Sequence, residues 1–203
     1  MKYNTSDRLV SKNGVLLNKF GIDDQNELNK KENNITSVQI VKLSIDPIKG
    51  SFDLKHLQAI HKHIFDQIYS WAGDIRNIDI SKGNSMFATN SRIIPEAEKL
   101  FSQLRKENYL KNTEPEKMAS RLAYYLGEIN AIHPFREGNG RTQRVFISQL
   151  AKEAGFELTF DKTTQEEMIQ ASIAAYFCDY TGLESIIERG LKPLSNHLEK
   201  LKL

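Results

Sequence analysis

The sequence of 203 residues has almost no cysteine, no excess of one charge and no long apolar segment. Its one cysteine, Cys178, excludes an intramolecular disulfide. Because Cys178 follows the apolar residues Tyr176 and Phe177, we expect it to pack in the core rather than to act as a reactive thiol. The 28 basic residues nearly balance the 26 acidic ones, for a net charge of +2. Nucleic-acid-binding proteins usually have a clearly basic face, so we expect no direct nucleic-acid partner.

A membrane-spanning helix needs about 18 or more apolar residues in a row, and the chain has no such run. The first eight residues also lack the apolar segment of a secretory signal. We therefore expect a cytoplasmic protein with no membrane partner. Charged residues make up 27% and hydrophobic residues 39% of the chain, which is an ordinary globular balance. The length is that of one domain with a substantial core.

Apolar residues recur at helical spacing through most of the chain. Over residues 54–71 they form one stripe, with Asp53 as the expected N-cap and Gly73 as the stop signal. The segment 113–116, Thr-Glu-Pro-Glu, is predicted to be a capping box with proline at the first helical position, before a further helix. We expect an all-α fold, whose other helices lie near 23–45, 92–107, 141–154, 163–177 and 181–190.

One short region departs from the helical period. Polar residues 81–85, which include a Gly-Asn pair, have apolar neighbours on both sides: Ile75, Ile78 and Ile80 before them, Met86 and Phe87 after them. This pattern predicts a small β-hairpin. An isolated hairpin is only marginally stable in water, so we expect it to pack on the helices or to pair with another strand.

The most informative segment runs from His133 to Arg144 and reads HPFREGNGRTQR. It lies between two predicted helices, and the second begins near Gly140. A loop that leads into a helix presents unpaired N–H groups beside the positive end of the helix dipole, and both favour an anion. Glycines at 138 and 140 let the backbone approach phosphate oxygens closely. Arg141 and Arg144 lie one turn apart and reach the same polyphosphate.

The other polar residues of this segment suit phosphoryl-type chemistry. Glu137 offers a hard oxygen ligand to Mg²⁺, and His133 titrates near neutrality and accepts a proton from an attacking hydroxyl. Phe135 is expected to point into the core. The segment is not a Walker A loop, because the Gly-Lys-Ser/Thr ending is missing.

Each of these residues alone has an ordinary structural explanation: a histidine before proline is usually structural, and a Gly-Asn-Gly run is usually a turn. Together, eight defined residues at fixed spacing would arise by chance with a probability on the order of 10⁻⁸, at about 5% usage each. The segment resembles the signature loop of the Fic-domain family, His-Pro-Phe-x-Asp/Glu-Gly-Asn-Gly-Arg-x-x-Arg. Residues 71–73, 127–130 and 170–173 and the hairpin also resemble that family.

The resemblance covers about residues 15–190 of a single domain that spans 1–203, with 191–203 as a C-terminal tail. It implies a helical Fic-type domain with the hairpin as a flap over the nucleotide. It also implies a protein adenylyltransferase that uses Mg²⁺ and moves AMP from ATP to a hydroxyl side chain of a target protein. By the same resemblance His133 is the base and Glu137 the Mg²⁺ ligand. The residues that it assigns to ATP and phosphate binding are Glu137, Gly138, Asn139, Gly140, Arg141, Thr142 and Arg144, and those of the flap and further nucleotide contacts are Ile80, Ser81, Lys82, Gly83 and Gln170.

Two alternatives remain open. A related phosphotransferase binds ATP inverted and transfers the γ-phosphate, but in the family that activity goes with an altered second glycine, whereas Gly140 and Arg141 are intact here. The other alternative is a non-catalytic interaction module with an inert nucleotide pocket. The presence of both His133 and Glu137 argues against it.

The resemblance also implies a mode of inhibition. Many Fic proteins are restrained by a Ser/Thr-x-x-x-Glu-Gly/Asn helix, whose glutamate pairs with the second arginine of the loop, here Arg144. Segments 163–167 and 195–199 have the Ser/Thr and the glutamate, but neither is followed by the small residue. We therefore expect that the chain is the toxin of a toxin–antitoxin pair, and that a separate small antitoxin supplies the glutamate to Arg144.

Overall fold

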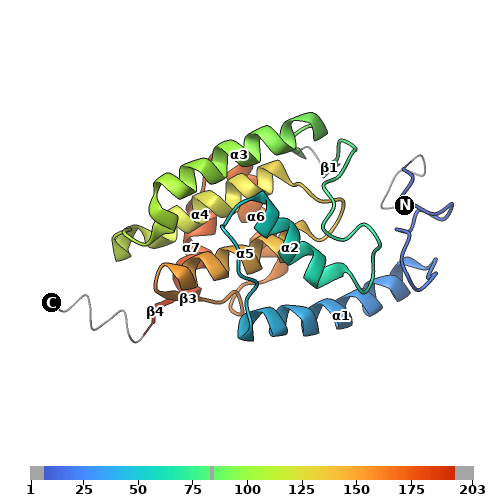
Figure 1. Cartoon of the computed structure of the whole chain (residues 1–203), viewed down its shortest axis with the longest axis horizontal. Coiled ribbons are helices and arrows are strands. Elements are labelled where there is room, and N and C mark those ends of the chain that lie inside the picture. The colour runs from blue at the N-terminus through green and yellow to red at the C-terminus, as the bar shows by residue number, and fades with distance from the viewer. Residues whose placement is uncertain (1–6, 83–84, 195–203) are drawn as a thin grey trace. The chain divides into compact units, whose positions relative to one another are not determined.

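In the computed structural model (Figure 1), the residues described are 7–82 and 85–194. The structure is mostly helical with a small β-hairpin, so the expected fold class is confirmed. The helices are α1 (Gln25–Ile45), α2 (Leu54–Phe65), α3 (Asn90–Lys106), the short 3-10 helix η1 (Asn108–Leu110), α4 (Pro115–Ile132), α5 (Asn139–Glu153), α6 (Gln165–Tyr176) and α7 (Thr181–Gly190). The strands are β1 (Ser81–Lys82), β2 (Ser85–Met86), β3 (Phe156–Leu158) and β4 (Leu191–Pro193).

The chain divides into two compact units. One contains the residues up to 48 together with 58–74, and the other contains 49–57 together with the residues from 75 onward. The two are described separately below. The expectation of a single domain over residues 1–203 stays a prediction.

The first unit is built around α1 and the turns that follow α2. The Asp24 side chain caps α1 by accepting the N–H of Glu27 at 2.8 Å. A buried hydrogen bond joins the Tyr69 hydroxyl to the Glu32 carboxylate of α1. Gly73 adopts φ 91°, a conformation that favours glycine, and its N–H donates to Nδ1 of His61 at 2.8 Å. Gly73 therefore ties the turns after α2 back to that helix.

The predicted helix over 54–71 is too long, because α2 ends at Phe65. The chain then turns, and Ile68 N–H donates to the carbonyl of Phe65 at 2.8 Å. Ile68 and Trp71 are nevertheless buried, as the apolar stripe predicts. The expected N-cap is confirmed, since Asp53 accepts the N–H of His56 at 2.8 Å.

The second unit is organised by α4, which packs against α3, α5, α6 and α7 (Figure 1). Five apolar residues recur at helical spacing along α4 and are all buried: Met118, Leu122, Tyr125, Leu126 and Ile129. From α5, Phe146 fills the same core and is fully buried. The segment 133–138, which links α4 to α5, is thus held at both ends by packed helices.

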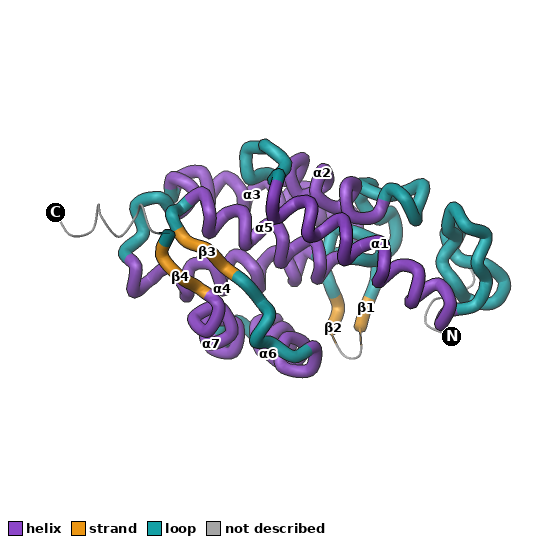
Figure 2. The backbone as a smooth tube through the Cα atoms, turned by 90° about the horizontal axis from the view of Figure 1, so that it is seen from below, coloured by secondary structure: helices purple, strands orange, loops and turns teal. Residues whose placement is uncertain are grey.

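The expected hairpin is present, with Ser81 opposite Met86 and Lys82 opposite Ser85 in antiparallel register. A second antiparallel pair, β3 with β4, was not expected; it joins the residues after α5 to those after α7. Figure 2 shows the two pairs as separate orange ladders. Three-residue strands are too short to give a period-2 signal, so sequence pattern alone does not predict β3 and β4.

The predicted capping box at 113–116 is wrong. Pro115 is the first residue of α4, as expected, and this makes Glu114 the N-cap, with no side-chain hydrogen bond. Thr113 therefore lies one position too early to cap the helix. A capping box does exist at α6, where Thr164 and Glu167 exchange hydrogen bonds.

The expectation that Cys178 packs in the core is also wrong, because its thiol is exposed. Helix α6 ends at Tyr176, and Cys178 adopts φ 64° in the turn that follows. Phe177, beside it, is 73% exposed. The apolar residues 176–178 thus lie at the C-terminal end of α6, where Phe177 and Cys178 are exposed to solvent. Within residues 7–82 and 85–194, no helix is both long enough and apolar enough to cross a membrane.

Candidate active site

The loop between α4 and α5 begins and ends with a left-handed residue. His133 is the C-cap of α4, with φ 48° and ψ 62°, and Gly138 is the N-cap of α5, with φ 79°. Glycine adopts this conformation freely, whereas for a histidine it costs about 1–2 kcal/mol. Such a residue persists only where its surroundings hold it. The contacts that hold His133 are therefore part of the site.

The buried Asn139 side chain closes the loop. Its Oδ1 accepts the N–H of Phe135 at 2.9 Å, and its Nδ2 donates to the Phe135 carbonyl at 2.7 Å. Phe135 itself is fully buried, as expected. The side chain of Asn139 thus shapes the loop, and an anion contact from this residue would come from its backbone N–H at the start of α5.

Thr142 and Gln143 lie on the buried face of α5. The Thr142 hydroxyl donates to the Gly138 carbonyl at 3.0 Å, and Gln143 Nε2 donates to the Ile129 carbonyl of α4 at 3.4 Å. Both bonds fix α5 to the loop. A phosphate contact from Thr142 stays a prediction, and the structure gives its hydroxyl a backbone partner.

The imidazole of His133 is held by a hydrogen bond and by an aromatic ring. Its Nδ1 lies 3.2 Å from the carbonyl oxygen of Asn130. Because a carbonyl only accepts, Nδ1 carries the proton in the neutral ring, and Nε2 has the lone pair. The ring of Phe87 stacks on the imidazole, with centroids 3.7 Å apart and planes at 15°.

Four successive carbonyls at the end of α4, those of residues 131–134, accept hydrogen bonds from the segment that contains the hairpin. A helix leaves its last carbonyls without helical donors, and these bonds supply them. They run from Ala88 N to Ala131 O (3.0 Å), from Arg76 Nη2 to Ile132 O (3.3 Å), from Arg76 Nε to His133 O (2.8 Å) and from Arg76 N to Pro134 O (2.9 Å).

Positive charge gathers at the first turn of α5. Burial lowers the pKa of the Arg144 guanidinium, and the nearby charge of Arg141 lowers it further. No carboxylate among the described residues pairs with Arg144. A Cβ at Gly140 would lie 3.4 Å from a guanidinium nitrogen of Arg144. A side chain at 140 would therefore enter the space beside these cations.

Glu137 lies immediately before this helix and is partly exposed. Its Oε1 accepts the N–H of Gly138 at 3.0 Å, which orients the carboxylate at the N-terminus of α5. The described part of the chain has no group of three or more His, Cys, Asp or Glu residues that could hold a metal ion. Mg²⁺ commonly uses one or two carboxylates together with substrate phosphates, and Glu137 fits that pattern.

The remaining predicted residues are on the hairpin and on α6. Ile80 accepts the N–H of Phe87 at 3.4 Å across the hairpin, and Ser81 and Lys82 form β1. Gly83 falls outside the described residues. Gln170 is exposed on α6, and its amide donates to Glu166 of the same helix at 2.7 Å. The structure thus brings the hairpin to His133, and it gives no contact between Gln170 and the loop.

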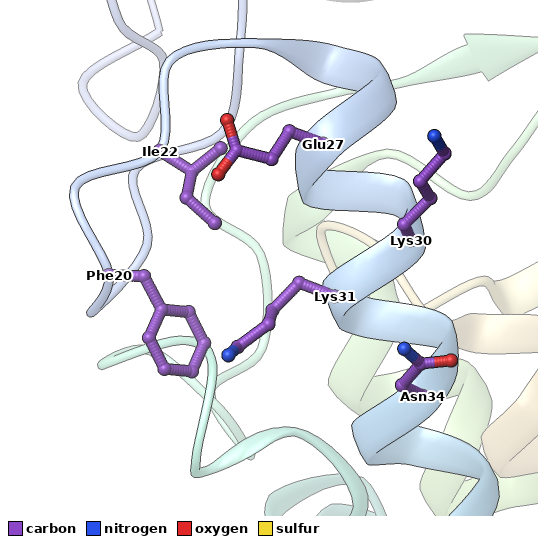
Figure 3. A pocket seen from close by; sticks show the side chains of 6 residues that line it. All are labelled: Phe20, Ile22, Glu27, Lys30, Lys31 and Asn34. Atoms are coloured by element: carbon purple, nitrogen blue, oxygen red, sulfur yellow. The ribbon is translucent and has the colours of Figure 1, made fainter.

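Two surface cavities are lined by residues outside the loop at 133–144. In the first unit, a cavity of about 410 Å³ opens beside α1, where Lys31 Nζ lies 4.9 Å from the centroid of Phe20 (Figure 3). In the second unit, a cavity of about 270 Å³ lies between the start of α4 and β4. Neither is lined by residues 133–144.

Sequence reasoning missed two residues that contact His133 or its carbonyl, Arg76 and Phe87. Arg76 is an isolated basic residue, a type that is mostly exposed, yet it is only 4% exposed here. Phe87 was expected only as a flank of the hairpin. The one sequence signal for them was their position beside the predicted hairpin, with Arg76 before it and Phe87 directly after it.

The fold is a helical domain in which a loop with His133 at its start leads into the N-terminus of α5. The Fic/DOC family model matches residues 51–151. Among curated relatives, the protein adenylyltransferase VbhT of Bartonella schoenbuchensis is 42% identical over 178 residues. That match takes in 88% of this chain but 37% of VbhT. The probable protein adenylyltransferase y4lH of Sinorhizobium fredii is 39% identical, over 86% of this chain and 90% of that protein.

Two solved structures have the same fold as this chain. The BepC effector of Bartonella tribocorum with bound AMPPNP matches at a TM-score of 0.87 and 26% identity, over 92% of this chain and 97% of that one. An N-terminal Fic domain from Bartonella quintana with bound ADP matches at 0.87 and 29% identity, over 94% and 97%. The chain belongs to the Fic/DOC family.

Proposed function

We propose that this chain is a Mg²⁺-dependent protein adenylyltransferase, which transfers AMP from ATP to a hydroxyl side chain of a target protein. Its relatives VbhT and y4lH are named a protein adenylyltransferase and a probable protein adenylyltransferase, and a similar structure binds AMPPNP. The observation that carries the proposal is the fixed imidazole of His133 on the loop that leads into the N-terminus of α5. A base and an anion site thereby meet on one loop.

His133 acts as the general base through Nε2. The Asn130 carbonyl holds the proton on Nδ1, so Nε2 has the lone pair that accepts a proton. As the target hydroxyl oxygen forms its bond to the α-phosphorus of ATP, the bond from that phosphorus to the β-bridging oxygen breaks. The hydroxyl proton passes to Nε2, and pyrophosphate leaves.

The N-terminus of α5 binds the phosphates. Gly138 has no side chain to cap the helix, so the first N–H groups of α5 are available to phosphate oxygens. Arg141 and Arg144 add two cations. Burial lowers the pKa of Arg144 and repulsion from Arg141 lowers it further, and a bound polyanion relieves that repulsion. Glu137 would hold Mg²⁺, which neutralises charge on the phosphates.

The hairpin is the target-binding element in this proposal. An extended segment of the target adds to its edge as a further strand, and this aligns the hydroxyl with His133. The position of Phe87 supports this, because it follows β2 directly and stacks on the His133 ring.

The proposal includes control by a separate antitoxin that places a glutamate on Arg144, in the cytoplasm, where ATP is available. Arg144 pairs with no carboxylate of the described chain, as noted above. The candidate Glu167 is already engaged, because it accepts from Thr164 at the start of α6 and pairs with Arg189 at 3.0 Å. The other candidate segment, 195–199, lies outside the described residues.

Labelling with two forms of ATP tests the reaction. The chain is incubated with a bacterial lysate and ATP labelled with ³²P at either the α- or the γ-phosphate. AMP transfer predicts labelled protein bands with the α-label alone. Bands with the γ-label alone would make the chain a phosphotransferase, and no bands with either label would favour the non-catalytic module.

A further inference from the structure

We propose that Arg76 is a positioning residue for the reaction, which locks the hairpin and His133 in one register. The inference rests on the function proposed above, in which His133 is the base. Arg76 lies in the segment before β1 and is 4% exposed. This role follows from the set of carbonyl groups to which its guanidinium donates hydrogen bonds.

The guanidinium of Arg76 donates to carbonyls on both sides of the site. On the α4 side its Nε donates to His133 O at 2.8 Å and its Nη2 to Ile132 O at 3.3 Å. On the hairpin side its Nη1 donates to Ile78 O at 2.6 Å, and its Nη2 also donates to Ala88 O. One side chain thus joins the residues before β1, the residues after β2 and the end of α4.

The two acceptors that matter most are next to the stacked rings. One is the carbonyl of His133 itself, and the other belongs to Ala88, the residue directly after Phe87. The stack of Phe87 on His133 therefore depends on two backbone groups that share the same guanidinium. A shift of either one relative to the other would slide one ring across its partner.

Only arginine meets this requirement. Its donors form a rigid planar fork, whereas lysine has a single compact ammonium group with three donors. Four carbonyls at the distances above need a planar group with several nitrogens. The carbonyls of Ile132 and His133 also form the negative end of the α4 dipole, which favours a cation there.

The charges around Arg76 fit a permanent structural cation. Burial lowers its pKa, the Asp79 carboxylate raises it, and Arg136 lowers it. Asp79 is itself held in place, because its Oδ1 accepts the N–H of Asn90 at 2.6 Å. None of the hydrogen-bond acceptors of Arg76 lies in residues 138–144, which form the start of α5. Its loss is therefore expected to spare nucleotide binding.

The first test is spectroscopic and needs no activity. Stacking on Phe87 displaces the ¹H chemical shift of His133 Cε1–H by the ring current, and Phe87→Leu gives the shift without it. Arg76→Lys should move the shift at least half of the way to the Phe87→Leu value, while Arg92→Lys on the exposed face of α3 leaves it unchanged. A wild-type shift in folded Arg76→Lys would overturn the proposal.

A measurement on the unmodified protein covers the case in which Arg76→Lys does not fold. The Nε–H of Arg76 should exchange slowly with solvent and show a through-hydrogen-bond scalar coupling to the carbonyl carbon of His133. A rapidly exchanging Nε–H without that coupling would overturn the proposal.

The second test separates positioning from general stability. In Arg76→Lys we expect kcat for AMP transfer to fall on the order of 10²-fold, as for a displaced catalytic group, with the Kd for AMPPNP within about two-fold of wild type. Equal losses in kcat and AMPPNP binding with an unchanged His133 shift would mean a merely structural role. A wild-type chain that transfers no AMP would refute the proposed function, and the spectroscopic result would still decide the placement of Arg76.

Discussion

Phe87 lies flat against His133, with ring centroids 3.7 Å apart and an interplanar angle of 15°. The two residues are 46 positions apart in the sequence and come from the end of the hairpin and the end of α4. This contact places the hairpin directly on the proposed base. A target strand that adds to the hairpin therefore adds to an element that already touches His133.

The contact also explains how a histidine keeps a left-handed conformation. His133 N–H donates to Ile129 O at 3.0 Å, its carbonyl accepts from Arg76, and one ring face is covered by Phe87. Backbone, carbonyl and ring are thus each fixed by a different neighbour. Such over-determination is what a strained conformation at a functional site requires.

The Mg²⁺ ligand is tested by Glu137→Gln. We expect a large loss of AMP transfer that excess Mg²⁺ only partly restores, because the substitution removes the charge of the metal's main protein ligand. Glutamine keeps an oxygen that accepts the Gly138 N–H, so the loop should keep its shape. Glu116→Gln, on the exposed start of α4, is the control. Transfer rates titrated against Mg²⁺ decide, and an unchanged Mg²⁺ dependence would exclude Glu137 as the ligand.

Loop closure by Asn139 is tested by Asn139→Ala. The change leaves the buried N–H and carbonyl of Phe135 without the partners seen here, which should cost on the order of 3 kcal/mol of unfolding free energy. For a chain of this length that is a fall of about 6–12 °C in Tm. Asn34→Ala on the exposed face of α1 should stay within about 0.5 kcal/mol. Thermal melts that show equal Tm values for the two variants would contradict the closure role.

We predict that the folded state loses stability at alkaline pH when the hydroxyl of Tyr180 loses its proton. Burial raises its pKa, and the hydrogen bond to Glu128 raises it further. A pKa raised in the folded state means that the fold binds this proton more tightly than the unfolded chain does. The contribution is complete below the ordinary tyrosine pKa near 10 and declines as the pH rises above it.

Melting curves at pH 8 and pH 10.5 measure this effect. The wild-type chain should lose more Tm between the two than Tyr180→Phe, because phenylalanine has no proton to lose. Tyr176→Phe, on the nearby end of α6, is the matched control. Equal losses in wild type and Tyr180→Phe would show that Tyr180 does not titrate with the fold.

If a separate antitoxin inhibits the chain, the C-terminal tail should not inhibit AMP transfer. Deletion of residues 195–203, which leaves β4 intact, should not raise AMP transfer. A small helical protein that co-purifies with the chain should lower it, and Arg144→Lys should weaken that inhibition because lysine lacks the planar fork that pairs with a carboxylate. A marked gain of activity on truncation would place the brake in this chain.

Much of this architecture could be predicted from periodicity and from one motif. The stripe of α4 and the loop at 133–144 are local signals, because each depends on residues a few positions apart. The hairpin also follows from local turn chemistry. The ends of the helices are predicted less accurately. Helix α2 ends at Phe65 rather than near Trp71, because the turns at 66–74 bury the remaining apolar residues of the stripe without a helix.

The contacts that complete the site could not be predicted in this way. Arg76 reaches His133 across 57 positions, and no local pattern distinguishes it from a surface arginine. Phe87 and the pairing of β3 with β4 depend equally on tertiary packing. Cys178 was misassigned because an apolar stretch at a helix end looks the same in sequence whether it is buried or exposed.

The role of His133 is tested most directly by comparing wild type with His133→Ala in two assays on the same preparation. One is transfer of α-labelled AMP to the target protein, and the other is binding of AMPPNP. We predict that the variant loses transfer while its Kd for AMPPNP stays within about two-fold, since the base acts on the attacking hydroxyl and not on the nucleotide. Comparable turnover by His133→Ala would contradict the account.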